Sequence, residues 1–361
     1  MSVHHRSRGP TTPARSLRRD SFRRATQAPL PRWAPRRLAL AVGTVVLVSI
    51  GMAAPVLAQE THVFIITGVA GDEEHVKQFH KLATTFIDGV KKRGGVPEAN
   101  IVYLSDKPET DPSLIRGRST RENVERALTG LAANAKPSDE IFLLLIGHGS
   151  FDGQQAAFNL PGPDLTASDW AKLLKKFQTQ RVVFVNTASA SGAFLAIVAG
   201  PGRTIVTATK TGGERNETSF AQFFVEAYAD ETADLDRNGR VSVLEAFNFA
   251  KTKVLKAYEQ KGTLLTEHAA LDDGADGKLA ATMFLGSTSA AAALGVDTSD
   301  PEMRALVGER DTLDKRIAEL KLTKDSQDPA RYEQELEKLL TELAVKTRAI
   351  RDLQAKKDTR R

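Results

Sequence analysis

Short apolar runs alternate with stretches of helical periodicity over residues 61–285. Residues 63–66, 141–146 and 182–185 are continuously apolar, which is typical of strands buried on both faces of a sheet. Residues 73–92 instead carry apolar side chains near a spacing of 3.6 residues, as in an amphipathic helix. This alternation predicts an α/β domain, with a mostly parallel central sheet covered by helices on both faces.

The same pattern predicts the remaining elements of this domain. Strands are expected over residues 100–104 and 203–209, and a loop over residues 158–164. Helices are expected over residues 166–177, 219–229 and 244–258. A further helix is expected to begin at Ser119, because Glu122 three residues later completes a capping box.

The C-terminal part has a different pattern. Residues 286–299 are rich in Ser, Ala and Gly and are predicted to be a linker. Two heptad-like apolar runs follow, separated by a break at Asp325–Pro329, so residues 300–361 are predicted to form an antiparallel helical hairpin or coiled coil. The two stripes can pack against each other. The alternative is that they form a docking or oligomerising arm.

Residues 1–58 have the layout of a signal peptide. A basic region ends at Arg36-Arg37, an apolar core runs from Leu38 to Ala54, and small residues lead to Ala58. We predict cleavage after Ala58 and export to the periplasm or the medium. The alternative is an uncleaved segment that tethers the protein to a membrane, since residues 38–58 are nearly long enough to span one.

The net charge of +5 comes from this leader. Residues 1–58 contain ten Arg and a single acidic residue, Asp20, so the rest of the chain has a net charge of −4. This distribution argues against a nucleic-acid partner. The chain also contains no cysteine, so an exported form must be stabilised without disulfides.

Candidate chemistry follows two of the predicted strands. The strand over residues 141–146 ends in Gly147-His148-Gly149, and the strand over residues 181–186 runs into Thr187–Gly192, which contains Ser189. The carboxyl ends of parallel strands lie at one edge of a sheet, where α/β proteins bind their ligands. We therefore expect His148 and Ser189 to face one cleft.

These two strand ends resemble the caspase and legumain clan of cysteine peptidases, and the legumain branch most closely, over roughly residues 61–285. The resemblance implies a caspase-like three-layer sandwich in which His148 is the base and Ser189 occupies the position of the nucleophilic cysteine. It also implies that Ala190 replaces the glutamate of the legumain pattern. Gly149, Ala190 and Thr207 then occupy substrate-binding positions.

The replacement of the thiol leaves three functions open. A serine nucleophile needs a base oriented by a third group, and Asp152 is the nearest carboxylate in sequence. The favoured hypothesis is a catalytically degenerate legumain-like domain, a pseudoenzyme, that binds a protein or peptide, with Ser189 and Ser191 merely capping a helix that begins near Gly192. The alternatives are an active hydrolase with a Ser189–His148 dyad and an assembly module that acts through the helical hairpin.

Residues 234–245 match the twelve-residue EF-hand loop. Asp234, Asp236 and Asn238 supply side-chain oxygens at alternate positions, and Gly239 allows the sharp turn. Arg240 can offer its carbonyl, and Glu245 closes the loop with a bidentate carboxylate. The pattern predicts one structural calcium ion. The alternative is a plain turn without an ion.

Overall fold

The computed structural model describes residues 60–236, 238, 240–274, 277–286, 296, 300–323 and 327–358. The described residues all belong to one compact unit, residues 57–361, which is the second of two units along the chain. The predicted signal peptide, Gly239 and most of the predicted linker lie outside the described residues.

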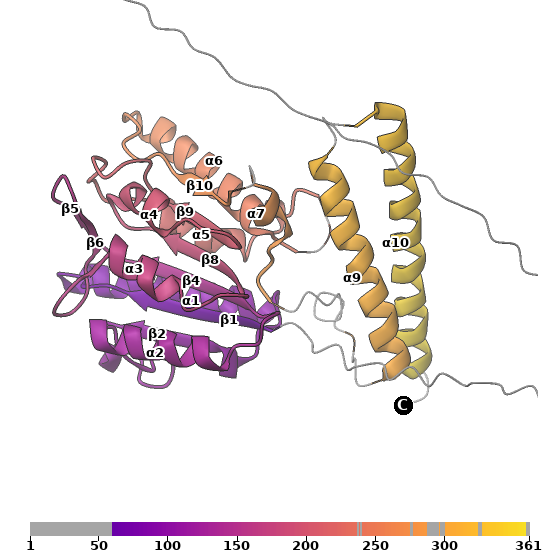
Figure 1. The fold of residues 1–361 in the computed structure, drawn as a ribbon, viewed down its shortest axis with the longest axis horizontal. Helices are drawn as coiled ribbons and strands as arrows, with labels where there is room; N and C mark the ends of the chain where they lie inside the picture. Colours follow the sequence, from indigo (N-terminus) through magenta and orange to yellow (C-terminus); the bar gives the residue numbers. More distant parts are fainter. Residues whose placement is uncertain are drawn as a thin grey trace, which may run out of the picture. The chain divides into compact units, whose positions relative to one another are not determined.

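The second unit is built on a seven-stranded sheet with the order β10-β9-β8-β4-β1-β2-β3 (Figure 1). All neighbouring strands are parallel except β10, which pairs antiparallel with β9 at the edge. The strands are β1 (Thr61–Thr67), β2 (Ile101–Ser105), β3 (Gly117–Arg118), β4 (Glu140–Ile146), β8 (Arg181–Asn186), β9 (Arg203–Thr207) and β10 (Ala270–Asp272). The central strand β4 is buried along its whole length, as its continuous apolar run predicts.

Helices cover both faces of this sheet and complete three layers. One core contains side chains of α1 (Glu73–Lys92), α5 (Phe220–Ala227), α6 (Val243–Lys261) and the short α7 (Lys278–Thr282). The other contains side chains of α2 (Arg121–Asn134), α3 (Ala167–Leu174) and α4 (Leu195–Val198). The prediction of an α/β fold with a mostly parallel sheet is confirmed.

A small second sheet follows β4. It has the order β5-β6-β7, with β5 at Gly149–Phe151, β6 at Ala156–Phe158 and β7 at Leu165–Thr166. The sequence pattern predicts only a loop in this region. Strands of two or three residues are too short to produce a periodic pattern. This sheet begins directly after His148 and so lies beside the predicted site.

One local prediction was wrong, and one strand was not predicted. Helix α2 begins one residue later than expected, with Thr120 as its cap, and the Ser119 hydroxyl donates instead to the carbonyl of Thr67 on β1. Residues 270–272, for which the sequence pattern indicates no strand, form the edge strand β10. In both cases long-range hydrogen bonds override the local signal.

The C-terminal helices are α9 (Pro301–Leu322) and α10 (Pro329–Asp358), which run side by side (Figure 1). Asp300 caps α9 through the backbone N–H of Glu302, with Pro301 at the first helical position. Their apolar stripes pack against each other in two clusters, centred on Ile350 and on Leu339. No helix within the described ranges is long and apolar enough to cross a membrane.

Candidate functional site

The sheet brings the two predicted strand ends together. Strands β4 and β8 are parallel neighbours, with Leu145 opposite Asn186, so the residues after them emerge at the same edge. His148 and Ser189 both line one small cavity of about 20 Å³ at this edge. A cavity of that size holds about one water molecule.

The imidazole of His148 is oriented by the backbone. Its Nε2 lies 3.3 Å from the carbonyl oxygen of Ala70, which follows β1. A carbonyl only accepts hydrogen bonds, so this contact needs the proton on Nε2. In the neutral ring Nδ1 is then the free acceptor, which is the state that a general base requires.

To act as a nucleophile, Ser189 would have to give its hydroxyl proton to a base, but that hydroxyl is engaged elsewhere. It donates to the carbonyl of Gly149 at 3.2 Å, and the side chain is only 9% exposed. Ser189 does not cap a helix as one hypothesis expected, because the short 3-10 helix over Ser191–Phe194 has no side-chain cap. Ser191 instead hydrogen-bonds Thr209 through its hydroxyl.

The other predicted site residues have mainly structural contacts. Ala190 is buried in the left-handed region with φ of 57°, and its N–H donates to the carbonyl of Glu214. Thr207 is fully buried and donates to the carbonyl of Thr209, so neither residue lines the cavity at His148. Gly149 needs to be glycine, because an added Cβ would overlap the carbonyl oxygen of Ser189.

A loop over residues 210–218, which we call the cover loop, packs against the turn that contains Ser189. The Thr218 hydroxyl donates to the carbonyl of Thr187 at 2.6 Å. An added Cβ at Gly192 would overlap the backbone of Lys210 and Thr211, which shows how closely the loop approaches. The cover loop therefore packs on the Ser189 turn at both of its ends, at Thr187 and at Gly192.

His75 on α1 joins the cover loop to the candidate base. Its ring lies 5.0 Å from the ring of His148, and its Nε2 lies 3.5 Å from a carboxylate oxygen of Glu217. The hydrogen bond that the His75 Nδ1–H donates to the Asp72 carboxylate raises the pKa of His75, and the charge of Glu217 adds to this shift. The sequence gives no sign of the contacts that His75 makes with His148 and Glu217, nor of the Ala70 carbonyl, since these join segments far apart in the chain.

Asp152 does not orient His148. One of its carboxylate oxygens accepts hydrogen bonds from the backbone N–H groups of Gln154 and Gln155, so it closes its own turn. The third group beside the candidate base is thus a backbone carbonyl rather than a carboxylate.

Comparison with known proteins relates part of this chain to a peptidase family. Residues 113–266 match the model of the peptidase C13 family. The match covers less than half of the chain, includes both His148 and Ser189, and supports a peptidase-like fold for this region. No curated protein matches the chain significantly.

Solved structures with a similar outline include two insect caspases. The Drosophila initiator caspase Dronc is 12% identical, with a TM-score of 0.37, over 59% of this chain and 79% of its own. Caspase-1 from Spodoptera frugiperda is 10% identical, with a TM-score of 0.38, over 60% of this chain and 86% of its own. Likenesses this weak carry no argument about activity.

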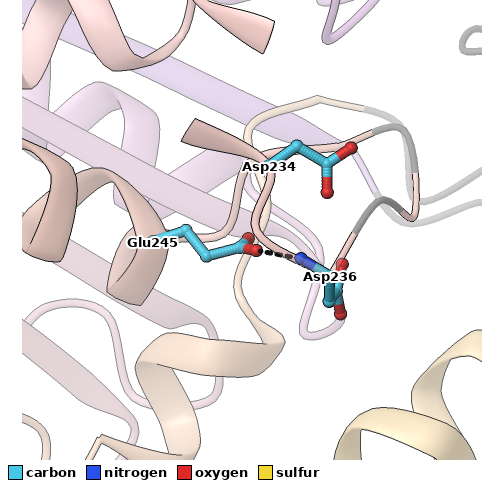
Figure 2. A group of neighbouring side chains, drawn as sticks. All are labelled: Asp234, Asp236 and Glu245. Carbon is cyan, nitrogen blue, oxygen red and sulfur yellow. Dashed lines mark hydrogen bonds between the residues drawn. The ribbon is translucent and has the colours of Figure 1, made fainter. Parts of the chain in front are cut away.

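The EF-hand-like loop brings its acidic residues together (Figure 2). Carboxylate oxygens of Asp234, Asp236 and Glu245 all lie within 4.8 Å of one another. One oxygen of Glu245 accepts from the backbone N–H groups of Leu235 and Asp236, and the other accepts from Ser242 in a capping box for α6. Burial raises the pKa of Glu245, and the charge of Asp236 adds to the shift.

The other two predicted ligands, Asn238 and Arg240, are engaged in contacts within the protein. The side-chain oxygen of Asn238 accepts from the N–H of Arg240. The Arg240 side chain is buried, with its guanidinium 4.1 Å from the centre of the Phe284 ring and 3.8 Å from Asp314 on α9. Lys321 of α9 forms an ion pair with Asp236 at 3.2 Å. The donor set suits a hard cation, and an ion there would compete with Lys321 for Asp236.

A larger cavity lies elsewhere. It has a volume of about 930 Å³ between α6 and the segment around β10, and it shares no lining residue with the cavity at His148. A choice of site by cavity volume would therefore point away from His148 and Ser189, which are candidates because of their positions after two neighbouring strands.

Proposed function

We propose that the sheet-based domain is a peptidase-like domain with little or no peptidase activity, which binds a protein or peptide at the site around His148. One observation carries this proposal. Ser189, the residue that the resemblance implies for the nucleophile position, donates its hydroxyl hydrogen to the Gly149 carbonyl, and the chain has no cysteine.

The chemistry explains why this change matters. A thiolate is strongly nucleophilic near neutral pH, whereas a serine hydroxyl reacts only when a base accepts its proton. In the neutral ring, the Ala70 contact keeps the proton of His148 on Nε2 and leaves Nδ1 as the acceptor that a base needs. This supports a site that has lost its nucleophile and kept the orientation of its base.

The test restores the sulfur by Ser189→Cys and compares it with the same variant carrying His148→Ala. Because the chain has no other thiol, absorbance of the thiolate against pH gives the pKa of this single cysteine directly. We expect His148 to lower that pKa by about one unit, roughly a tenfold gain in thiolate near neutral pH. Faster alkylation by iodoacetamide should accompany it.

Ser138→Cys provides the control, because Ser138 is exposed and precedes β4 at the opposite end of the sheet. Its pKa should not respond to His148→Ala. Equal thiol pKa values at position 189 with and without His148 would show that the two residues do not act together. The shared-site argument would then be wrong.

The second candidate is an active serine hydrolase. Its support is that the contact with Ala70 leaves Nδ1 of His148 as the acceptor and that both side chains line one cavity. A fluorophosphonate probe distinguishes the candidates. Labelling of the unmodified protein that disappears with Ser189→Ala would support the hydrolase, and the degenerate-domain proposal predicts no labelling.

We also propose that residues 234–245 bind one calcium ion with a structural role. The support is the complete twelve-residue pattern together with the three converging carboxylates. Binding would tie the end of α5 to the start of α6, and its test is a calcium-dependent rise in melting temperature.

The third part of the proposal concerns export. The basic start, the apolar run and the small residues before Ala58 support a cleaved signal peptide and a periplasmic or secreted protein. Amino-terminal sequencing of the exported protein should find Gln59. A chain that begins at Met1 in a membrane fraction would favour the anchor.

A further inference from the structure

One face of α10 is exposed and has an ordered charge pattern. Its members recur every three or four residues, so they form a single stripe along the helix. From the N-terminal end of the helix they are Glu333, Glu337, Leu340, Thr341, Ala344, Arg348 and Arg351, all of them exposed. The stripe is acidic at one end, uncharged in the middle and basic at the other. We call it the α10 stripe.

The middle of the α10 stripe is an apolar groove. Leu340 is 45% exposed, and a shallow depression of about 570 Å³ is lined by Leu336, Leu340, Ala344 and the polar residues beside them. Helix α9 leaves Leu340 and Ala344 exposed, because its buried contacts with α10 are made on the other side, at Leu339 and Ile350, with Leu336 at the border.

The charges of the stripe differ from those elsewhere on the hairpin. Glu335 and Lys346 of α10 form ion pairs with Arg316 and Glu309 of α9. By contrast, Glu333, Glu337 and Arg351 form no ion pair with any of the described residues. Arg348 makes only a 3.9 Å contact with Asp352 on its own helix.

We propose that the α10 stripe is a homodimer interface, on which α10 of a second copy of this chain lies antiparallel. A two-fold axis through residue 342 places Leu340 opposite Ala344 of the partner copy. The same axis places Glu333 opposite Arg351, and it places Glu337 opposite Arg348 within one residue. The result is a four-helix bundle with an apolar centre and ion pairs on either side.

The pattern selects this occupant and this orientation. An interface between identical chains related by a two-fold axis must be self-complementary, and the stripe is complementary to itself only when it is reversed. A parallel arrangement would place acids against acids and bases against bases, which is unfavourable. Other partners would have to reproduce the same order of charges.

Single cysteines test the orientation, because the full chain contains no thiol of its own. With a rise of about 1.5 Å per residue, two copies of position 341 lie about 3 Å apart along the proposed axis, whereas two copies of position 355 lie about 39 Å apart. Thr341→Cys should therefore cross-link to its own copy with a short bis-maleimide. Ala355→Cys, which is also exposed, should not.

Charge reversal tests the pairing by light-scattering mass. We expect about two chains per particle for the unmodified protein, and one chain for Glu333→Arg with Glu337→Arg or for Arg348→Glu with Arg351→Glu. An equimolar mixture of these two variants should return to about two chains, since every pair in the mixed dimer is then complementary.

The matched control reverses two exposed acids of the sheet-based domain, Glu109→Arg with Glu259→Arg, and should keep the mass of the unmodified protein. A single-chain mass for the unmodified protein at all concentrations would overturn the proposal. So would dimers that survive both reversals, failure of the mixture to recover, or equal cross-linking at positions 341 and 355.

Discussion

The turn that contains Ser189 and the loop over residues 234–245 each bring candidate functional groups together. They differ in how far apart those groups lie in the sequence. His148, Ser189 and the Ala70 carbonyl meet because three parallel strands, β1, β4 and β8, end at the same edge. In the loop, Asp234, Asp236 and Glu245 are brought together within twelve consecutive residues.

The two regions are also held in different ways. The Ser189 turn is fixed by distant backbone, mainly the carbonyl of Gly149 and the cover loop. In the 234–245 loop, side chains hold neighbouring backbone, as when Asn238 donates its N–H to Asp234 and Asp236. The first site should therefore depend on tertiary packing, and the second on its own sequence and a cation.

The largest expected effect on stability comes from Gly192→Ala. The added Cβ would overlap the backbone of Lys210 and Thr211, which cannot rotate out of the way as a side chain could. We expect the free energy of unfolding in urea to fall by about 3 kcal/mol.

Gly213→Ala is the control in the same loop. Gly213 is exposed, and its nearest neighbour would be the Thr211 hydroxyl at 3.5 Å, so the change should stay within about 0.5 kcal/mol. If both variants are equally stable, the cover loop does not pack on the Ser189 turn as described.

Calcium should stabilise the protein through the 234–245 loop. At about 100 times its dissociation constant, an ion bound only by the folded state adds about 2.7 kcal/mol, seen as a higher melting temperature. Glu245→Gln should remove most of this rise, because the amide is neutral and cannot bind the ion through two carboxylate oxygens.

Glu231→Gln is the matched control, since Glu231 is an exposed acid just before the loop. It should retain the calcium response. Identical melting temperatures of the unmodified protein in calcium and in chelator would mean that the loop is only a turn.

The smallest expected effect concerns His75. Its raised pKa means that its pair with Asp72 contributes stability that is fully present below the unfolded value of 6.5 and is lost as the pH rises through the folded pKa. An NMR titration should therefore place the His75 pKa above 6.5, and Asp72→Asn should lower it.

Asp88→Asn tests whether the effect is specific, since Asp88 is an exposed acid on the same helix. It should leave the His75 titration unchanged. A His75 pKa that ignores Asp72→Asn would show that the Asp72 carboxylate does not pair with His75 as the structure indicates.

The sequence by itself determined the long elements and the local motif. The buried run of β4, the full extent of α1 and the cap of α3 at Thr166 follow from periodicity and capping, which act within a few residues. The convergence of the loop carboxylates follows in the same way from their spacing. The order of apolar strands and helices was also enough to predict the fold class.

Tertiary structure alone decided the state of the candidate site. The hydroxyl of Ser189 could have faced His148 or capped a helix, and its actual acceptor is the backbone carbonyl of Gly149. The Ala70 carbonyl that orients His148 carries no signal in its side chain. Strands of two or three residues, such as β5, β7 and β10, have no readable period. Their partners lie far away in sequence, so only the folded chain brings these groups within hydrogen-bonding distance.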